Sequence, residues 1–315
     1  MSVLIYIENT DGTIKKGTLE AVSYGVNLAA ANGTSAIGVS IGNVSEDELK
    51  KVVNYGLKSL VNIPLDETSI SHQSVAATLK SIAESKQATS IVMSNSWMGK
   101  STAPRLAVMG DFGVVTEVVD LPANKVVKKK GFSGKAFVSI NLENDENIFA
   151  IAPNSYGLKE NAVDVTLENG NAVTDESVKH LSYNKDTSKI SLTDAELVVS
   201  AGRGLKGPEN WGMIDELANV LGAGTACSKP VSDADWRPHH EHVGQTGITI
   251  SPNLYIAIGI SGAIQHLAGV SSSKKIVVIN TDPEAPFFKA ADYGIVGDAF
   301  EVVPKLTEAI RKIKS

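Results

Sequence analysis

Residues 197–207 read Leu-Val-Val-Ser-Ala-Gly-Arg-Gly-Leu-Lys-Gly, and this stretch decides the fold of the C-terminal part of the chain. The apolar run 197–200 is short, as in a buried strand, and the apolar spacing over 208–221 is helical. A glycine-rich turn between a strand and a helix is a context in which main-chain amides bind phosphate groups. A plain turn without a ligand fits the same residues, so both interpretations stay open.

The alternation of strand and helix continues from this stretch to the C-terminus, which predicts a doubly wound parallel sheet. Helices are expected at 208–221, near 261–267 and at 304–313. Further short apolar runs predict strands at 224–227, 254–260, 276–280 and 294–296. In the first of these helices the apolar residues recur every three to four positions, which marks its core face: Trp211, Ile214, Leu217 and Leu221.

The N-terminal part alternates in the same way and predicts a second parallel sheet covered by helices. Its expected strands lie at 3–7, 36–41, 60–63 and 90–93, and its helices at 19–31, from Ser45 onward, and at 75–85. Ser45 and Glu48 have the spacing of a capping box. After residue 113 the chain breaks into short β-like runs that we expect to be antiparallel additions: 114–119, 125–127, 136–140, 148–152 and 162–167.

The polar segment 182–189 resembles a linker, so the sequence predicts an α/β protein of two domains, 1–188 and 189–315. The chain has 315 residues, of which 43% are hydrophobic and 20% charged, as in a globular protein. Its net charge of −6 argues against nucleic-acid binding. The single cysteine, Cys227, excludes a disulfide within the chain. The first ten residues lack a signal-peptide pattern, so we expect a cytoplasmic protein without membrane insertion.

Two further turns carry hydrogen-bond donors. The turn 243–247 reads Val-Gly-Gln-Thr-Gly, and its exposed amides and side chains suit the edge of a polar heterocycle, although, taken alone, the turn is more typical of a plain turn without a ligand. The turn 261–266 reads Ser-Gly-Ala-Ile-Gln-His, with Ser261 as the expected N-cap of a helix whose N-terminus is open to an anion. Turns that follow parallel strands meet at the carboxyl edge of the sheet, so the three turns should form one site.

Two other readings of the sequence are weaker. An NAD site usually has an acidic residue about 20 positions after the glycine turn, and this chain has Ala226, Cys227 and Ser228 there. The run His239-His240-Glu241-His242 does not have the spacing of a common zinc motif. We therefore expect the histidine run to be a solvated loop and assign neither a metal site nor catalytic residues.

Taken in order, the motifs closely resemble those of the electron transfer flavoprotein α subunit. The resemblance extends over about 197–310 and rests on five strings: Ser-Ala-Gly-Arg-Gly-Leu-Lys at 200–206, Val-Gly-Gln-Thr-Gly at 243–247, Leu-Tyr-Ile-Ala-Ile-Gly-Ile-Ser-Gly-Ala-Ile-Gln-His-Leu-Ala-Gly at 254–269, Asn-Thr-Asp-Pro-Glu-Ala-Pro at 280–286 and Ala-Asp-Tyr-Gly at 291–294. The first 180 residues fit the family's order of elements but carry no comparable signature.

The resemblance implies one FAD, bound mainly by the C-terminal domain. Within it, Ser261 and its turn would face the pyrophosphate, Thr246 and His266 the isoalloxazine, and Asn280 and Asp298 the adenosine end. His266 would stabilise negative charge on the reduced ring. The FAD ligands that the resemblance implies are Arg203, Ser228, Val243, Gly244, Gln245, Thr246, Ser261, Gly262, Ala263, Ile264, Gln265, His266, Asn280, Asp298 and Ala299.

The resemblance also implies an electron carrier rather than a catalyst with its own substrate. Such a carrier is a heterodimer with a β subunit, which the N-terminal domain would contact. Electrons would arrive from acyl-CoA dehydrogenases in fatty acid β-oxidation and leave for a membrane quinone oxidoreductase. Lys229 stands where many members have an arginine over the flavin, so the charge stays and the planar stacking is lost. A nucleotide- or NAD-dependent enzyme using the 202–207 turn, and a regulatory module with a vestigial site, remain the alternatives.

Overall fold

The computed structural model describes residues 1–132, 134, 136–175, 177–178 and 191–314. The chain divides into two compact units: Met1–Gly131 with Phe137–Lys185, and Asp186–Ser315 with Phe132–Ala136. The expected linker 182–189 and the domain boundary inside it lie outside the described residues. Within the described ranges, no helix is both long enough and apolar enough to cross a membrane.

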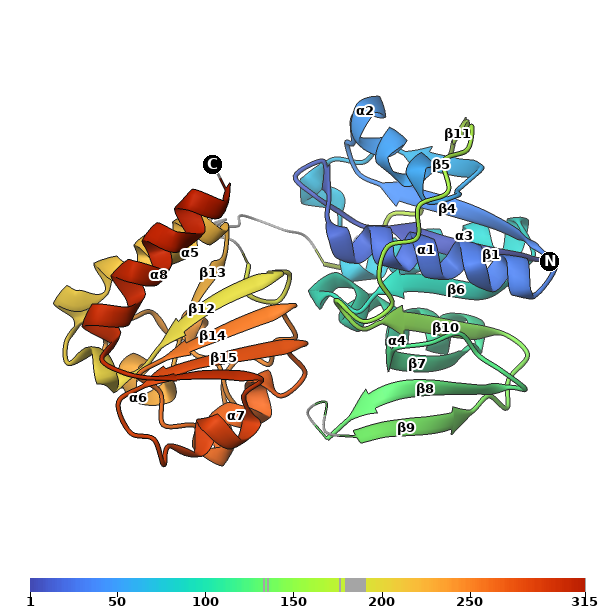
Figure 1. Ribbon diagram of the computed structural model, residues 1–315. Coiled ribbons are helices and arrows are strands. Elements are labelled where there is room, and N and C mark those ends of the chain that lie inside the picture. The colour runs from blue at the N-terminus through green and yellow to red at the C-terminus, as the bar shows by residue number, and fades with distance from the viewer. Residues whose placement is uncertain (133, 135, 176, 179–190, 315) are drawn as a thin grey trace. The chain divides into compact units, whose positions relative to one another are not determined.

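The first unit is built on a nine-stranded sheet of order β11-β5-β4-β1-β6-β10-β7-β8-β9 (Figure 1). Its central strands are almost wholly buried because helices cover both faces. The strands are β1 (Ser2–Ile7), β4 (Ser35–Ile41), β5 (Ser59–Ile63), β6 (Ala88–Ser94), β7 (Gly113–Val118), β8 (Val126–Gly131), β9 (Ala136–Asn141), β10 (Asn147–Ile151) and β11 (Thr166–Asn169). A two-stranded antiparallel ribbon, β2 (Asn9–Thr10) with β3 (Thr13–Ile14), follows β1.

Helix α1 (Lys16–Ala31) covers one face of this sheet, and α3 (His72–Ser85) and α4 (Trp97–Gly110) cover the other. The buried side of α1 includes Tyr24 and Leu28 and packs on Ile5 and Phe149. Short helices complete the unit: α2 (Glu46–Leu49) and 3-10 turns at Lys50–Asn54 and Glu67–Ser69.

Two local expectations for this unit are wrong. Strands β7, β10 and β11 pair in parallel, whereas β8 joins β7 as an antiparallel strand, through Val118 and Lys129, with β9 beyond it. Ser45 does cap α2, with its Oγ accepting from the Glu48 N–H at 3.3 Å. The Glu48 carboxylate, however, accepts from the Ile14 N–H at 2.7 Å, so its tertiary partner replaces the expected reciprocal bond of a capping box.

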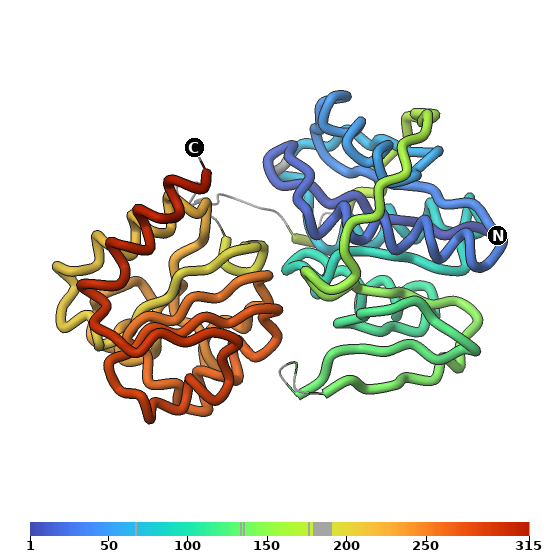
Figure 2. The backbone as a smooth tube through the Cα atoms, in the orientation of Figure 1, coloured from blue at the N-terminus to red at the C-terminus, as the bar shows by residue number. Residues whose placement is uncertain are grey.

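The second unit holds a five-stranded, fully parallel sheet of order β13-β12-β14-β15-β16. The strands are β12 (Leu197–Ala201), β13 (Gly224–Cys227), β14 (Leu254–Ile258), β15 (Lys275–Asn280) and β16 (Tyr293–Val296). Figure 2 follows the backbone of this unit from β12 in yellow to the last helix in red. The doubly wound parallel sheet expected from the sequence is confirmed.

Helices α5 (Gly212–Leu221) and α8 (Ala299–Lys314) pack on one face of this second sheet, and α7 (Ile264–Val270) packs on the other. The expected core residues of α5 are buried or nearly so. Short pieces connect the strands: α6 (Lys229–Ser232) and 3-10 turns at Arg203–Leu205, Pro208–Asn210, His239–Glu241 and Pro286–Ala290. The strand order reverses between β12 and β14, which makes the carboxyl ends of these two strands the topological switch point of the sheet, where ligands bind in such folds.

Candidate functional site

A cavity of about 450 Å³ opens beside the switch point, a size typical of small-molecule sites. It is lined by segments that follow β12, β13 and β14 together with the loop 242–246. Its fifteen lining residues are Arg203, Ser228, Lys229, Pro230, His242, Val243, Gly244, Gln245, Thr246, Gly259, Ile260, Ser261, Ala263, Gln265 and His266. Chain segments more than 60 positions apart in the sequence thus meet at one sheet edge.

The glycines of the first turn hold two loop backbones against each other. A Cβ on Gly202 would lie 2.4 Å from the Gly259 carbonyl oxygen. The Gly202 and Gly204 N–H groups donate to Ile258 and Gly259 at 2.9 and 3.1 Å. These amides therefore bond to the neighbouring loop, and the expectation that the turn leaves its amides free for phosphate is wrong for both. The side chain of Arg203 is what this turn contributes to the cavity.

The second turn is also closed by its own backbone. Gly244 N–H donates to the Ile248 carbonyl at 3.2 Å, and Gln245 N–H donates to the Gln265 carbonyl at 2.7 Å. The amides that were expected to be exposed are thus hydrogen-bonded within the protein at these two positions. The exposed side chains of Gln245 and Thr246 remain as the polar groups of this turn at the cavity.

The third turn leads into α7, but its cap differs from the expected one. The residue before α7 is Ala263, and Ser261 lies two positions earlier, so Ser261 does not cap the helix. The backbone turns at Gly262, where φ is +84° and a Cβ would lie 2.5 Å from the Phe287 nitrogen. The 3-10 turn that begins at Pro286 therefore shapes the loop and aims the first turn of α7 at the cavity, where helix amides lack intrahelical partners.

Ten of the fifteen sequence-predicted ligand residues line this cavity, and five do not: Gly262, Ile264, Asn280, Asp298 and Ala299. The Asn280 side chain donates from Nδ2 to the Ile260 carbonyl at 3.0 Å and so supports the third turn from behind. Asp298 accepts from the Phe300 N–H at 3.0 Å at the start of α8. Both residues stand at the carboxyl ends of β15 and β16, on the same edge of the sheet as the cavity.

The expectation of a solvated histidine loop is wrong for two of its four residues. Glu241 is 2% exposed and receives two bonds from Arg237, at 2.6 Å from Nε and 2.7 Å from Nη2. His242 is 2% exposed and lines the cavity. The loop is buried because it runs beside β13, where the Val243 N–H donates to the Cys227 carbonyl at 3.1 Å. The histidine pattern alone gave no signal of this contact.

Both cavity histidines are held neutral. The pKa of His266 is lowered from 6.5 to about 4, mainly by burial and to a smaller extent by the neighbouring His242, against an opposing contribution of the Val243 backbone. Burial also lowers the pKa of His242, with a smaller contribution from His239. Arg203 and Lys229 supply positive charge, and none of the described lining residues is Asp or Glu. The cavity therefore suits an anionic ligand with polar acceptors.

One buried polar atom beside the cavity, Nδ1 of His242, lies on the Gly247 side of the imidazole ring. It has no hydrogen-bond partner among the described residues. A shielded polar atom of this kind costs about 1–3 kcal/mol unless a ligand or water satisfies it. FAD carries two phosphates and a heterocycle rich in acceptors and donors, so it matches the two cations and the polar side chains of this cavity.

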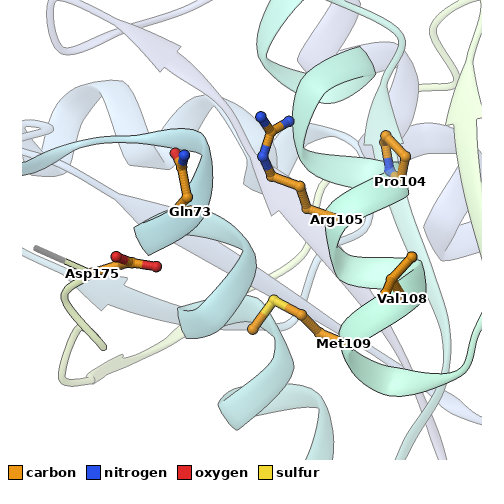
Figure 3. A pocket seen from close by; sticks show the side chains of 6 residues that line it. All are labelled: Gln73, Pro104, Arg105, Val108, Met109 and Asp175. Atoms are coloured by element: carbon orange, nitrogen blue, oxygen red, sulfur yellow. The ribbon is translucent and has the colours of Figure 1, made fainter. Parts of the chain in front are cut away.

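A second cavity of about 490 Å³ lies in the first unit, between α3 and α4 (Figure 3). Pro104, Val108 and Met109 of α4 give it an apolar wall, with Arg105 beside them and Gln73 and Asp175 across from them. Although slightly larger, it lacks the convergent donors of the switch-point cavity. No cluster of three or more His, Cys, Asp or Glu side chains suited to a metal is found within the described ranges.

The parallel sheet, its switch point and the cationic cavity define a doubly wound protein that binds an anionic nucleotide-type cofactor. Comparison with known proteins identifies the family within this class. The family described as "Electron transfer flavoprotein domain" matches residues 3–173, and "Electron transfer flavoprotein FAD-binding domain" matches residues 191–271. The chain belongs to the electron transfer flavoprotein α-subunit family, and its cofactor is FAD.

Curated relatives extend the similarity over nearly the whole chain. Electron transfer flavoprotein subunit alpha of Bacillus subtilis is 36% identical, with 99% of this chain and 98% of the relative covered. The subunit alpha of Thermoanaerobacterium thermosaccharolyticum is 33% identical, with 99% of this chain and 98% of the relative covered. A mitochondrial subunit alpha of Dictyostelium discoideum is 33% identical, with 99% of this chain and 92% of the relative covered. The similarity supports a role in electron transfer.

Proposed function

We propose that this chain is the FAD-binding subunit of a heterodimeric electron carrier, with a β subunit as its partner. The observation that carries the proposal is the cavity in which Arg203, Thr246 and His266 come together from three separate segments of the chain. Cations and neutral donors around a redox cofactor stabilise its reduced, negatively charged form. The exposed side chains of Trp97, Val108 and Met109 on α4 support the N-terminal unit as the subunit contact.

Within this proposal, different residues contact different parts of FAD. Thr246 and His266 would hold the isoalloxazine, and Ser261 and the first turn of α7 the pyrophosphate. Asn280, Asp298 and Ala299 would meet the adenosine end, beyond the cavity lining along the same sheet edge. FAD supplies the one-electron chemistry when bound, and the protein's part is to orient the ring and to place donors beside it.

The electron donors would be flavin dehydrogenases such as acyl-CoA dehydrogenases, and the acceptor a membrane quinone oxidoreductase. The test begins with the chain co-purified with its β subunit, which we expect to be yellow with flavin absorption bands and one FAD released per heterodimer. A reduced acyl-CoA dehydrogenase should then bleach these bands. A colourless complex that binds NAD would refute the proposal, and a flavin-containing complex that no such dehydrogenase reduces would refute the assigned donors.

A further inference from the structure

One hydrogen bond beneath the cavity links a residue outside the predicted ligand set to the cavity histidine. The Tyr255 hydroxyl lies 2.8 Å from His266 Nε2. Tyr255 is 0% exposed and His266 is 7% exposed, so the bond is shielded from water. Both rings pack on Phe287, Tyr255 in a stacked arrangement at 6.2 Å and His266 edge-on at 5.7 Å. The imidazole is therefore fixed in place by this hydrogen bond and by ring contacts with Phe287 and with Tyr255 itself.

The direction of this hydrogen bond follows from the protons available. Burial raises the pKa of Tyr255, so its hydroxyl stays protonated, and His266 is neutral with a single N–H. The Val243 carbonyl, which can only accept, favours a proton on the other ring nitrogen, although Nδ1 has no partner of regular geometry among the described residues. Ser200, whose hydroxyl interacts with that of Tyr255, can supply its donor, which leaves the Tyr255 proton for Nε2 and the imidazole proton on Nδ1, towards the Val243 carbonyl.

We propose that Tyr255 is a positioning residue of the FAD site, which holds His266 in the Nδ1–H tautomer by donating its hydroxyl proton to Nε2. The effect of Tyr255 on bound FAD rests on the proposed function, whereas its hydrogen bond to His266 does not. With Nε2 satisfied by a protein donor, the one N–H of His266 lies on the side of the ring next to the cavity loop 243–246. His266 is then a neutral ring of fixed orientation, whose buried N–H faces the Val243 backbone.

A fixed tautomer matters because the two ring nitrogens have opposite roles. A nitrogen that carries a proton attracts developing negative charge, whereas a nitrogen with a lone pair repels it. Without the Tyr255 hydroxyl, the imidazole would be free to move its proton to Nε2 or to rotate. The cavity would keep its shape, but the N–H dipole beside it would lose its fixed orientation, and fixed dipoles are what stabilise charge in a reaction site.

The test uses the full chain with its β subunit and FAD, labelled with ¹⁵N at its six histidines. Two-bond proton–nitrogen correlation reports which ring nitrogen carries the proton, and His266→Gln identifies the His266 signals. We expect the native protein to show a protonated Nδ1 and an unprotonated Nε2 at His266. In Tyr255→Phe this single-tautomer pattern should be lost, the potential for the first electron should become more negative, and FAD should bind up to about tenfold more weakly.

Tyr293→Phe is the matched control, because Tyr293 undergoes the same chemical change in the same unit but is 64% exposed and lies outside the cavity. It should leave the tautomer and the potential unchanged. A native His266 with its proton on Nε2 would overturn the proposal, even if Tyr255→Phe fails to fold. So would a Tyr255→Phe protein with an unchanged tautomer and potential. If the chain binds no FAD, the proposed function fails, and the tautomer of the FAD-free chain still decides the role of Tyr255.

Discussion

The Gly204 N–H donates to the Gly259 carbonyl at 3.1 Å, and a Cβ on Gly204 would lie 2.6 Å from the Gly259 Cα atom. Two loop backbones are thus in direct contact where β12 and β14 end. Gly259 has a φ of +60°, which places this chain reversal in the left-handed region. This contact brings Arg203 and Ser261 to one cavity, so the glycines act on the site through its shape.

Replacing Gly204 with alanine should therefore disrupt the cavity. The added methyl group meets backbone atoms that cannot rotate away, and we expect a loss of about 1–3 kcal/mol in the free energy of unfolding, together with weaker FAD retention. Urea denaturation and flavin release measure the two effects. Gly212→Ala is the control, because no atom lies within 4 Å of its added Cβ and it stands at the start of α5. Equal stability of the two variants would contradict this role of Gly204.

The buried pair Arg237–Glu241 should be essential for folding of the 242–246 loop. Removing the guanidinium leaves a carboxylate that is 2% exposed, which costs about 3–5 kcal/mol. Arg237→Ala should show this loss by thermal or urea unfolding. Arg311→Ala breaks a pair of similar length, Arg311–Glu216 at 2.6 Å, on the surface, and should cost less than about 1 kcal/mol. A loss of less than about 1 kcal/mol in Arg237→Ala would show that the buried pair is dispensable.

Acid should destabilise the protein through His266. Its pKa is about 4 in the folded chain and near 6.5 when unfolded, so between these values the unfolded state binds a proton that the native state does not. Stability is then complete above about pH 6.5 and falls as the pH drops towards 4, by up to about 3 kcal/mol. In His266→Gln the slope of unfolding free energy against pH should flatten over this range at fixed FAD concentration. Exposed His240 provides the control variant, His240→Gln, and a slope that persists in His266→Gln would refute the assignment.

Lys229 should tune the cofactor through its charge. It lines the cavity as the exposed first residue of α6, so its loss removes about 1 kcal/mol of attraction for a negative, reduced ligand. For Lys229→Gln we expect the potential for the first electron to fall by ~40 mV, as measured by spectroelectrochemistry. Lys229→Arg keeps the charge and should stay near the native value. Lys274→Gln, at the opposite end of β15, is the control, and an unchanged potential in Lys229→Gln would place Lys229 away from the flavin.

The sequence correctly predicted the elements of the C-terminal unit, because apolar runs and helical spacing there are long and regular. It was less successful with β10 and β11, because a short β-like run has the same appearance in parallel and antiparallel sheets. The pairing direction depends on where the chain returns to the sheet, which no local pattern encodes.

For the site, the motif order alone determined the family, the FAD cofactor and ten residues that line one cavity. Tertiary structure alone decided how each residue is used. The Gly202 and Gly204 amides bond to the neighbouring loop, His242 is buried beside β13, and Tyr255 reaches His266 from the adjacent strand. Burial and hydrogen-bond partners arise from segments distant in sequence, and these set the charge and the proton position of each group. A sequence therefore specifies which side chains are present, whereas only the packed chain specifies what each one faces.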